Sequence, residues 1–120
     1  REAGVGPEDI DAVIHTHLHI DHIGWNTYDG VGGKPAIWFP QARFVVQQAE
    51  WDYWMAPEML ADERNLPLRE CVEPLRDSGR LEFTQGEDSF DEHLVFISVP
   101  GHTPGHVAVG ISDRGERGVI

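Results

Sequence analysis

A cluster of histidines directly after a short apolar segment constrains this chain more than any other feature. Four of the seven histidines lie in the run His15-Thr16-His17-Leu18-His19-Ile20-Asp21-His22. The preceding segment 10–16 carries the run Ala12-Val13-Ile14, which is typical of a short buried strand. We therefore expect the histidines in a loop at the carboxyl end of a strand, where proteins commonly carry ligand-binding side chains.

The spacing within this cluster favours a metal site. Imidazole and carboxylate groups are good ligands for zinc and related divalent metals. Side chains two residues apart in an extended segment share a side, so His17, His19 and Asp21 are expected to converge. His22 is expected to point elsewhere and could serve a second metal about 3.5–4 Å from the first. The alternative is a histidine patch that binds no metal, and it is disfavoured because crowded imidazoles would compete for hydrogen-bond partners.

Composition limits the classes of partner. The chain has 120 residues, 40% of them apolar and 25% charged, as in an ordinary globular domain with a single core. The net charge of −12 argues against nucleic acid or an anionic membrane surface. We also expect a small-molecule substrate and a cytoplasmic location. Cys71 is the only cysteine, which excludes an internal disulfide and a cysteine-based zinc cluster, and it is expected to be a half-buried structural thiol on a helix.

Strand and helix signals alternate along the rest of the chain. Segment 26–40 is rich in Gly, Asp and Pro and is expected to form an irregular loop. Helices are expected at 47–55 and 65–78, the second kinked or broken at Pro74 and ended by Gly79. Strand signals occur at 42–46, 80–84, 93–99, 107–111 and 118–120, the last two around a turn at Ser112-Asp113-Arg114-Gly115. This alternation predicts the α/β class.

Two motifs give the chain a family resemblance. The pattern His-x-His-x-Asp-His after an apolar strand is similar to the signature of the metallo-β-lactamase superfamily, and residues 16–25 (Thr-His-Leu-His-Ile-Asp-His-Ile-Gly-Trp) resemble its hydrolase members. The segment Pro100-Gly101-His102-Thr103-Pro104-Gly105-His106 resembles the Gly-His-Thr-x-Gly-His segment of lactonases and glyoxalase II enzymes. The resemblance runs from residue 10 to residue 109. It implies that residues 1–120 form part of the four-layer αβ/βα sandwich of that fold.

The resemblance also implies a set of metal ligands. His17, His19 and His102 would hold the first metal, and Asp21 and His22 would help to hold the second. The implied cofactor is zinc, two ions per complete protein, with iron or manganese as alternatives. The family also uses an aspartate that bridges both metals and a final histidine. Asp113 is the only acidic candidate soon after His102, and we reject it because it lies in a predicted turn with no glycine before it.

Both missing ligands are therefore expected beyond Ile120. The chain opens at Arg1 without an initiator methionine and ends within the strand expected at 118–120, so we expect a domain truncated at both ends and inactive alone.

The implied activity is metal-dependent hydrolysis of an ester, lactone or thioester. A metal lowers the pKa of a bound water and so produces hydroxide near neutral pH, and Asp21 could accept or relay the proton of that water. A β-lactam or phosphotriester is a less favoured substrate. Alternatives within the same superfamily are an iron-dependent redox enzyme, such as a sulfur dioxygenase, and a phosphoesterase or nuclease. A diiron flavoprotein is a second redox alternative. It is less favoured, because such proteins usually have a glutamate where this chain has His19. A remnant that only binds metal is disfavoured, because all five ligands expected within this range are present.

Several other residues are candidates for the surroundings of the metals. His15 could orient a ligand, or it could be the last, outward-facing residue of its strand. His106 belongs to the second motif, yet the resemblance gives it no metal bond, so a packing or hydrogen-bonding role is preferred. Trp25 is close to His22 in sequence and is the best candidate for a substrate pocket. The remaining tryptophans could also line a pocket, but for Trp51 we prefer core packing.

Overall fold

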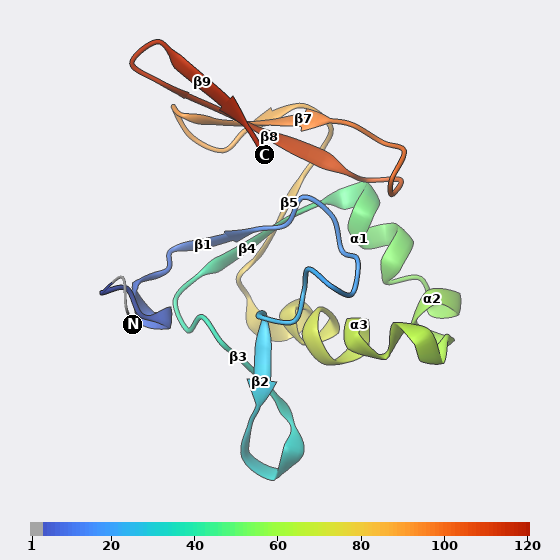
Figure 1. Ribbon diagram of the computed structural model, residues 1–120. Coiled ribbons are helices and arrows are strands. Elements are labelled where there is room, and N and C mark those ends of the chain that lie inside the picture. Colours follow the sequence, from blue (N-terminus) through green and yellow to red (C-terminus); the bar gives the residue numbers. More distant parts are fainter. Residues whose placement is uncertain (1–3) are drawn as a thin grey trace.

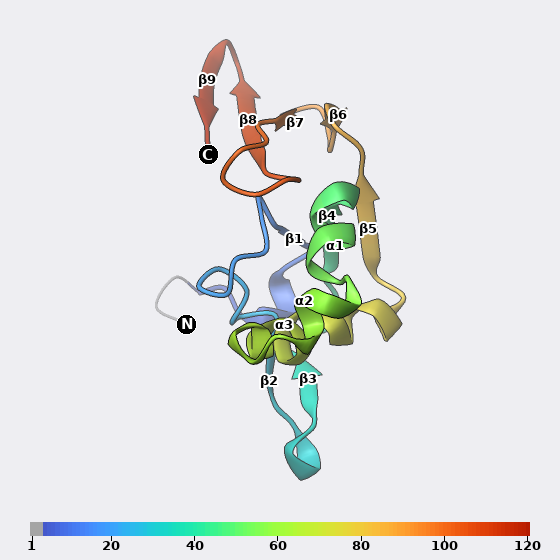
Figure 2. The same cartoon turned by 90° about the vertical axis from the view of Figure 1, so that its right-hand side faces the viewer.

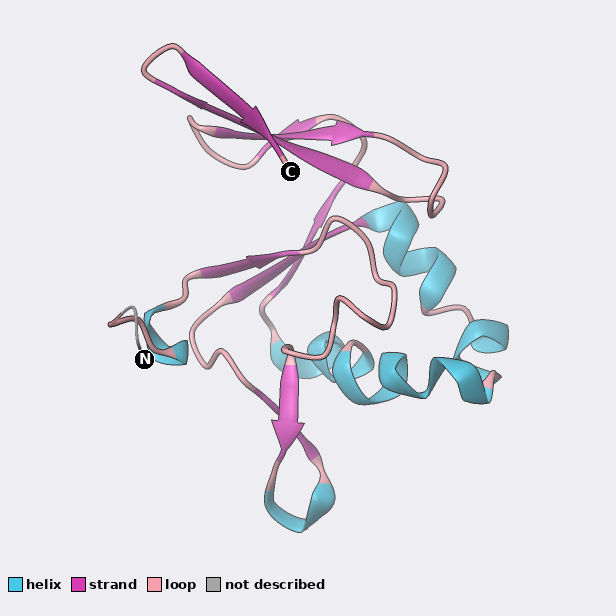
Figure 3. Cartoon of the chain, viewed as in Figure 1, coloured by secondary structure: helices cyan, strands magenta, loops and turns pink. Residues whose placement is uncertain are grey.

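The computed structural model describes residues 4–120 (Figure 1). Residues 1–3, at which we expected the chain to begin inside a longer protein, lie outside the described range. Helices and strands interleave along the chain as the α/β class requires (Figure 3). No helix among the described residues is long and apolar enough to cross a membrane.

A three-stranded parallel sheet lies at the centre of the structure. Its strands are β1 (Ala12–Ile14), β4 (Arg43–Gln47) and β5 (Leu81–Thr84), in the order β1-β4-β5. The central strand β4 pairs in parallel with both neighbours. Four of its five residues are buried, because other layers cover both faces of the sheet. The apolar run Phe44-Val45-Val46 is therefore the sequence of a strand with no solvent-facing side.

Helices form the crossover from β4 to β5 and cover one face of this sheet. They are α1 (Gln48–Trp54), α2 (Pro57–Ala61), α3 (Leu66–Cys71) and the 3₁₀ helices η3 (Glu63–Asn65) and η4 (Glu73–Ser78). Val46 of the sheet packs with these helices in one buried cluster, whose members are Leu18, Ile23, Val46, Trp51, Trp54, Met55, Leu68 and Val72. Cys71 is free and partly buried on α3, as its single occurrence suggested.

The helix expected over 65–78 is interrupted at Val72. The α-helix ends at Cys71, and η4 begins at Glu73 with Pro74 near its start. Proline has no N–H to donate to the preceding turn and its ring clashes with that turn, so the α-helical hydrogen bonds stop there. Gly79 ends η4 with a φ of 70°. The helix is therefore broken near Pro74 and ends at Gly79, as predicted from the sequence.

A four-stranded antiparallel sheet packs on the other face of the parallel sheet. Its strands, in order, are β6 (Asp88–Ser89), β7 (Leu94–Ser98), β8 (Val107–Asp113) and β9 (Glu116–Val119). In Figures 1 and 2 this sheet lies above the parallel sheet, and α2 and α3 lie below it. The cluster between the two sheets consists of Val45, Phe96, Val107 and Val109. The side chains of Val45 and Val46 thus point to opposite faces of the parallel sheet, as those of consecutive strand residues do.

Two hairpins differ from the expected boundaries. The segment 26–40, expected to be an irregular loop, contains β2 (Thr27–Asp29) and β3 (Pro35–Ile37), which pair antiparallel. Their glycine-rich tip is the 3₁₀ turn η2 (Val31–Gly33), so the glycines mark a turn and not a wholly irregular segment. The last turn is shorter than expected: Asp113 pairs with Glu116, and only Arg114 and Gly115, both with positive φ, connect β8 to β9.

Truncation of Phe44 tests the importance of the central strand. Phe44 is fully buried, and the Phe44→Ala variant is expected to lower the free energy of unfolding by about 3–5 kcal/mol. The matched control is Phe83→Ala on the edge strand β5, where the ring is 39% exposed and a clearly smaller loss is expected. Urea unfolding of the whole protein measures both, and equal losses would contradict the layered packing.

Candidate metal centre

Two loops from different sheets meet next to the carboxyl end of β1. The first follows β1 and carries His17 and His19, and the second, at 99–106, joins β7 to β8 and carries His102. The N–H of Val107, at the start of β8, donates to the carbonyl of Thr16 at 3.0 Å and so ties the two loops together. Nδ1 of His19 consequently lies 3.0 Å from Nε2 of His102, across 83 residues of sequence.

The three candidate ligands of the first metal form a compact group. One ring nitrogen from each of His17, His19 and His102 lies within 4.8 Å of the other two. The ring of His17 is at the centre, with centroids of four other imidazoles 4.6 to 5.0 Å away, those of His19, His22, His102 and His106. Its Nε2 is buried and makes no hydrogen bond. Since buried polar atoms are normally paired, this nitrogen fits a ligand of a divalent cation.

The electrostatics of His17 suit metal binding. Burial, and after it the neighbouring imidazoles of His22, His106, His19 and His102, together lower the pKa of His17 to about 4. The ring is therefore neutral at physiological pH, which is the form that donates a lone pair to a metal.

Asp21 and His22 do not lie as the extended-segment argument predicted. Residues 20–22 form a turn in which the N–H of His22 donates to the carbonyl of His19 at 3.0 Å. Among the described residues, the compact group does not include Asp21, whose carboxylate lies 3.4 Å from Nε2 of His22. The ring of His22 instead comes next to that of His17. The predicted convergence of Asp21 with His17 and His19 was wrong because the chain turns before Asp21.

His15 is buried, and its ring contact and side-chain hydrogen bond are with residues other than the imidazoles of the cluster. Its ring stacks on Phe44, and its Nε2 lies 3.0 Å from Oδ1 of Asn26. Burial also lowers the pKa of His15, although the contact with Asn26 acts in the opposite direction. The interpretation of His15 as an outward-facing end of the strand is therefore wrong. Its ring is buried and contacts Asn26, the residue that follows Trp25.

His106, from the second motif, also lies in the imidazole cluster. Its ring centroid is 4.9 Å from that of His17 and 5.6 Å from that of His102.

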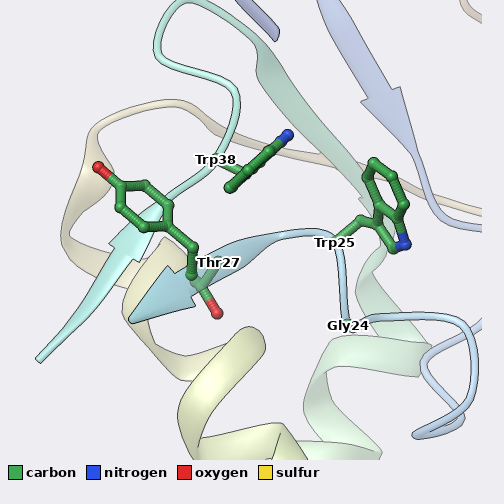
Figure 4. A pocket seen from close by; sticks show the side chains of 5 residues that line it. Gly24, Trp25, Thr27 and Trp38 are labelled. Atoms are coloured by element: carbon green, nitrogen blue, oxygen red, sulfur yellow. The ribbon is translucent and has the colours of Figure 1, made fainter. Parts of the chain in front are cut away.

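Trp25 lies between the histidines and an aromatic depression. Figure 4 shows Trp25 and Trp38 on the wall of this depression, which Gly24, Thr27 and Tyr28 complete. Trp25 is 76% exposed, and it also borders a second hollow lined by His17 and His22. An apolar part of a substrate bound at the histidines could therefore reach it. Trp51, by contrast, belongs to the core, as preferred.

Sequence reasoning missed one residue at this centre, Glu50 on α1. Its side chain is 1% exposed, and its carboxylate hydrogen-bonds to both histidine-bearing loops. No motif marks it. The only signal is its place among apolar helix positions that face the core, beside Trp51 and one turn before Trp54.

Comparisons with known proteins identify the family and support the fold. The family model described as "Metallo-beta-lactamase superfamily" matches residues 1–120. The chain belongs to the metallo-β-lactamase superfamily, as the two motifs indicated.

The matched sequence relatives include proteins named N-acyl homoserine lactonases. N-acyl homoserine lactonase AttM of Rhizobium radiobacter is 32% identical over 110 residues, which cover 88% of this chain and 37% of AttM. An N-acyl homoserine lactonase of Bacillus cereus is 27% identical over 88% of this chain and 34% of its own length.

Among solved structures, hydrolase AbOPH superposes with a TM-score of 0.81 at 26% identity, over 99% of this chain and 42% of AbOPH. The dizinc quorum-quenching lactonase AidC superposes with a TM-score of 0.74 at 25% identity, over 98% of this chain and 42% of AidC. The chain thus spans about two fifths of the length of these relatives.

The low pKa of His17 can be measured in metal-free protein. The ring is expected to stay neutral until the pH falls to about 4, against a value near 6.5 for an ordinary histidine. Because the unfolded chain takes up this proton at the higher pH, His17 contributes its full share of stability above about 6.5 and loses it as the pH falls toward 4.

Nitrogen-15 spectra of the ring nitrogens against pH give the midpoint, with urea-unfolded protein as the control. Equal midpoints in folded and unfolded protein would refute the electrostatic account.

Proposed function

We propose that this chain carries the metal-binding core of a metal-dependent hydrolase that opens lactones. The observation that carries the proposal is the group of three ring nitrogens, from His17, His19 and His102, within 4.8 Å of one another. These residues come from two separate motifs, and Nε2 of His17 is buried without a hydrogen-bond partner. Support for hydrolysis comes from the superfamily, and support for a lactone comes from the names of the relatives.

The histidines and Asp21 divide into two proposed ligand sets. His17, His19 and His102 would hold a first metal, and Asp21 and His22, which lie beside each other, would contribute to a second. Two zinc ions are proposed, because neutral imidazole and carboxylate suit zinc and because AidC is a dizinc lactonase. When bound, the metals would lower the pKa of water and polarise the lactone carbonyl.

The protein's own side chains would supply the remaining roles. The carboxylate of Asp21 is 75% exposed, so it can accept the proton that the attacking water loses. Nε2 of His22, 3.4 Å away, can orient that carboxylate. Trp25 and the aromatic depression beyond it would hold an apolar substituent of the substrate. An N-acyl homoserine lactone, the substrate that the relatives' names give, has a polar lactone ring and an apolar acyl chain and would match this arrangement.

Loss of His102 tests the metal assignment in the whole protein. Changing groups that only support a metal ligand costs about 10–100-fold, so His102→Ala is expected to lower lactone hydrolysis and metal content by at least about 100-fold. Exhaustive chelation should do the same, and added zinc should restore the wild type but not the variant. His93→Ala, on an exposed histidine directly before β7, is the matched control.

Elemental analysis and turnover of lactones, thioesters and aryl phosphotriesters are the measurements. A protein that keeps its turnover without metal would overturn the hydrolase proposal. Bound iron with negligible zinc would favour the redox alternative.

Trp25 is expected to determine the preference for acyl-chain length. Burying an aromatic side chain against a ligand is worth about 1.5–3 kcal/mol, so Trp25→Ala should lower kcat/KM for a long-chain acyl homoserine lactone by about 10- to 100-fold. The value for a lactone without an acyl chain should change little. Val31→Ala, at the exposed tip of the β2–β3 hairpin, is the control. An equal loss on both substrates would contradict the assignment of this pocket.

A further inference from the structure

We infer that Glu50 is a positioning residue whose buried carboxylate holds both histidine-bearing loops in register and thereby sets the affinity of the centre for metal. The inference rests on the proposed metal site. Glu50 itself is a residue of α1, outside both motifs, and it does not touch an imidazole through any of the hydrogen bonds described below. Figure 1 shows the start of α1 next to the loop that joins β7 to β8.

One carboxylate oxygen of Glu50 holds the first loop. Oε1 accepts a hydrogen bond from the backbone N–H of Leu18 at 2.9 Å and another from Nε1 of Trp54 at 2.7 Å. Leu18 stands between the candidate ligands His17 and His19. Trp54 extends the connection, because its ring contacts that of His19 edge-on with centroids 5.3 Å apart.

The other carboxylate oxygen holds the second loop. Oε2 accepts a hydrogen bond from Oγ1 of Thr103 at 2.7 Å and another from the backbone N–H of Gly105 at 3.0 Å. Thr103 is itself buried and directly follows His102. The two loops are thus joined through one side chain that lies 32 residues from Leu18 and 55 residues from Gly105 in sequence.

The set of partners fits a carboxylate and no other side chain. An ionised carboxylate only accepts and has room for about four hydrogen bonds, and all four partners of Glu50 are donors. Two of the donors are backbone N–H groups, which cannot become acceptors. Hydrogen bonds to a charged acceptor are stronger than those between neutral groups, so four of them offset the cost of burying the side chain.

Close packing at Gly105 supports the same conclusion. A Cβ atom at this position would lie 2.1 Å from the backbone nitrogen of Glu50 and 2.5 Å from its Cα. Only glycine lets the second loop approach α1 this closely. The hydrogen bonds to Glu50 therefore belong to a tight contact between backbones, in which a small displacement of the helix would move His102.

The conservative variant Glu50→Gln tests the inference in the whole protein. Its amide has nearly the same volume, but in either orientation its NH₂ group faces a backbone N–H, that of Leu18 or that of Gly105. One of the two loops must then lose its backbone hydrogen bond to residue 50. We expect the affinity for zinc to fall by about 10- to 100-fold, the range for groups that orient metal ligands. Competition against a chromophoric chelator measures the affinity, and the visible spectrum of the cobalt-substituted protein reports the ligand geometry.

A second pair of variants isolates one hydrogen bond. Thr103→Val removes the hydroxyl with little change of shape, and Thr103→Ser keeps it. Valine is expected to weaken zinc binding and change the cobalt spectrum, and serine is expected to restore both. This pair also decides the question if Glu50→Gln does not fold.

Leu75→Ala truncates a fully buried side chain of η4 and serves as the control for lost stability alone. It should lower the unfolding midpoint and leave zinc affinity and the cobalt spectrum unchanged. If Glu50→Gln and Thr103→Val behave like Leu75→Ala, Glu50 only stabilises the fold and the inference is wrong. If His102→Ala keeps the wild-type zinc affinity, the metal assignment itself is wrong and the inference falls with it. Loss of zinc in His102→Ala combined with wild-type binding in Glu50→Gln overturns the inference alone.

Discussion

The histidine centre depends on one constraint. The loops that carry His17 and His102, about 85 residues apart in sequence, must be held in a fixed position relative to each other. Two kinds of contact do this. The backbone hydrogen bond from Val107 to Thr16 joins the loops, and the carboxylate of Glu50 joins them again by accepting hydrogen bonds from donors on both. Neither contact involves an imidazole. The two loops are therefore held together without using a ligand nitrogen for that purpose, which suits a preorganised metal site.

The layered fold makes these contacts possible. The parallel sheet supplies β1, which ends at the first loop, and β4, which leads into α1 and so places Glu50 within hydrogen-bonding distance of both loops. The antiparallel sheet supplies the second loop between β7 and β8. Val45 packs toward one layer and Val46 toward the other, so β4 fixes both sheets and helices relative to one another. The centre thus lies where all three layers meet.

The parts of this arrangement that could be predicted are those with a local signal. The apolar run 12–14 and the helix break at Pro74 are short-range effects, and the two histidine motifs are read directly from their spacing. Asp21 shows where such reasoning fails: alternation predicts a shared side only in extended backbone, and the turn at 20–22 removes that condition. Glu50 carries no motif, because its partners come from distant parts of the chain. A sequence shows that such an acid sits among apolar residues, but not which donors surround it.

The two proposed ligand sets differ in how firmly the described structure holds them. His17 is 7% exposed and lies at the centre of the imidazole cluster, whereas the side chains of Asp21 and His22 are 75% and 55% exposed. Asp113 lies at the opposite end of β8 from the His102 loop, which supports its rejection as a shared ligand. The first set is built around the buried His17, whereas His19 is partly buried and His102 is exposed. Its two loops are nevertheless joined to each other without a metal. The exposed set borders the hollows that a substrate could enter, and its side chains keep the freedom to move a proton. In the proposed enzyme the first set would therefore anchor the centre, and the second would face the chemistry.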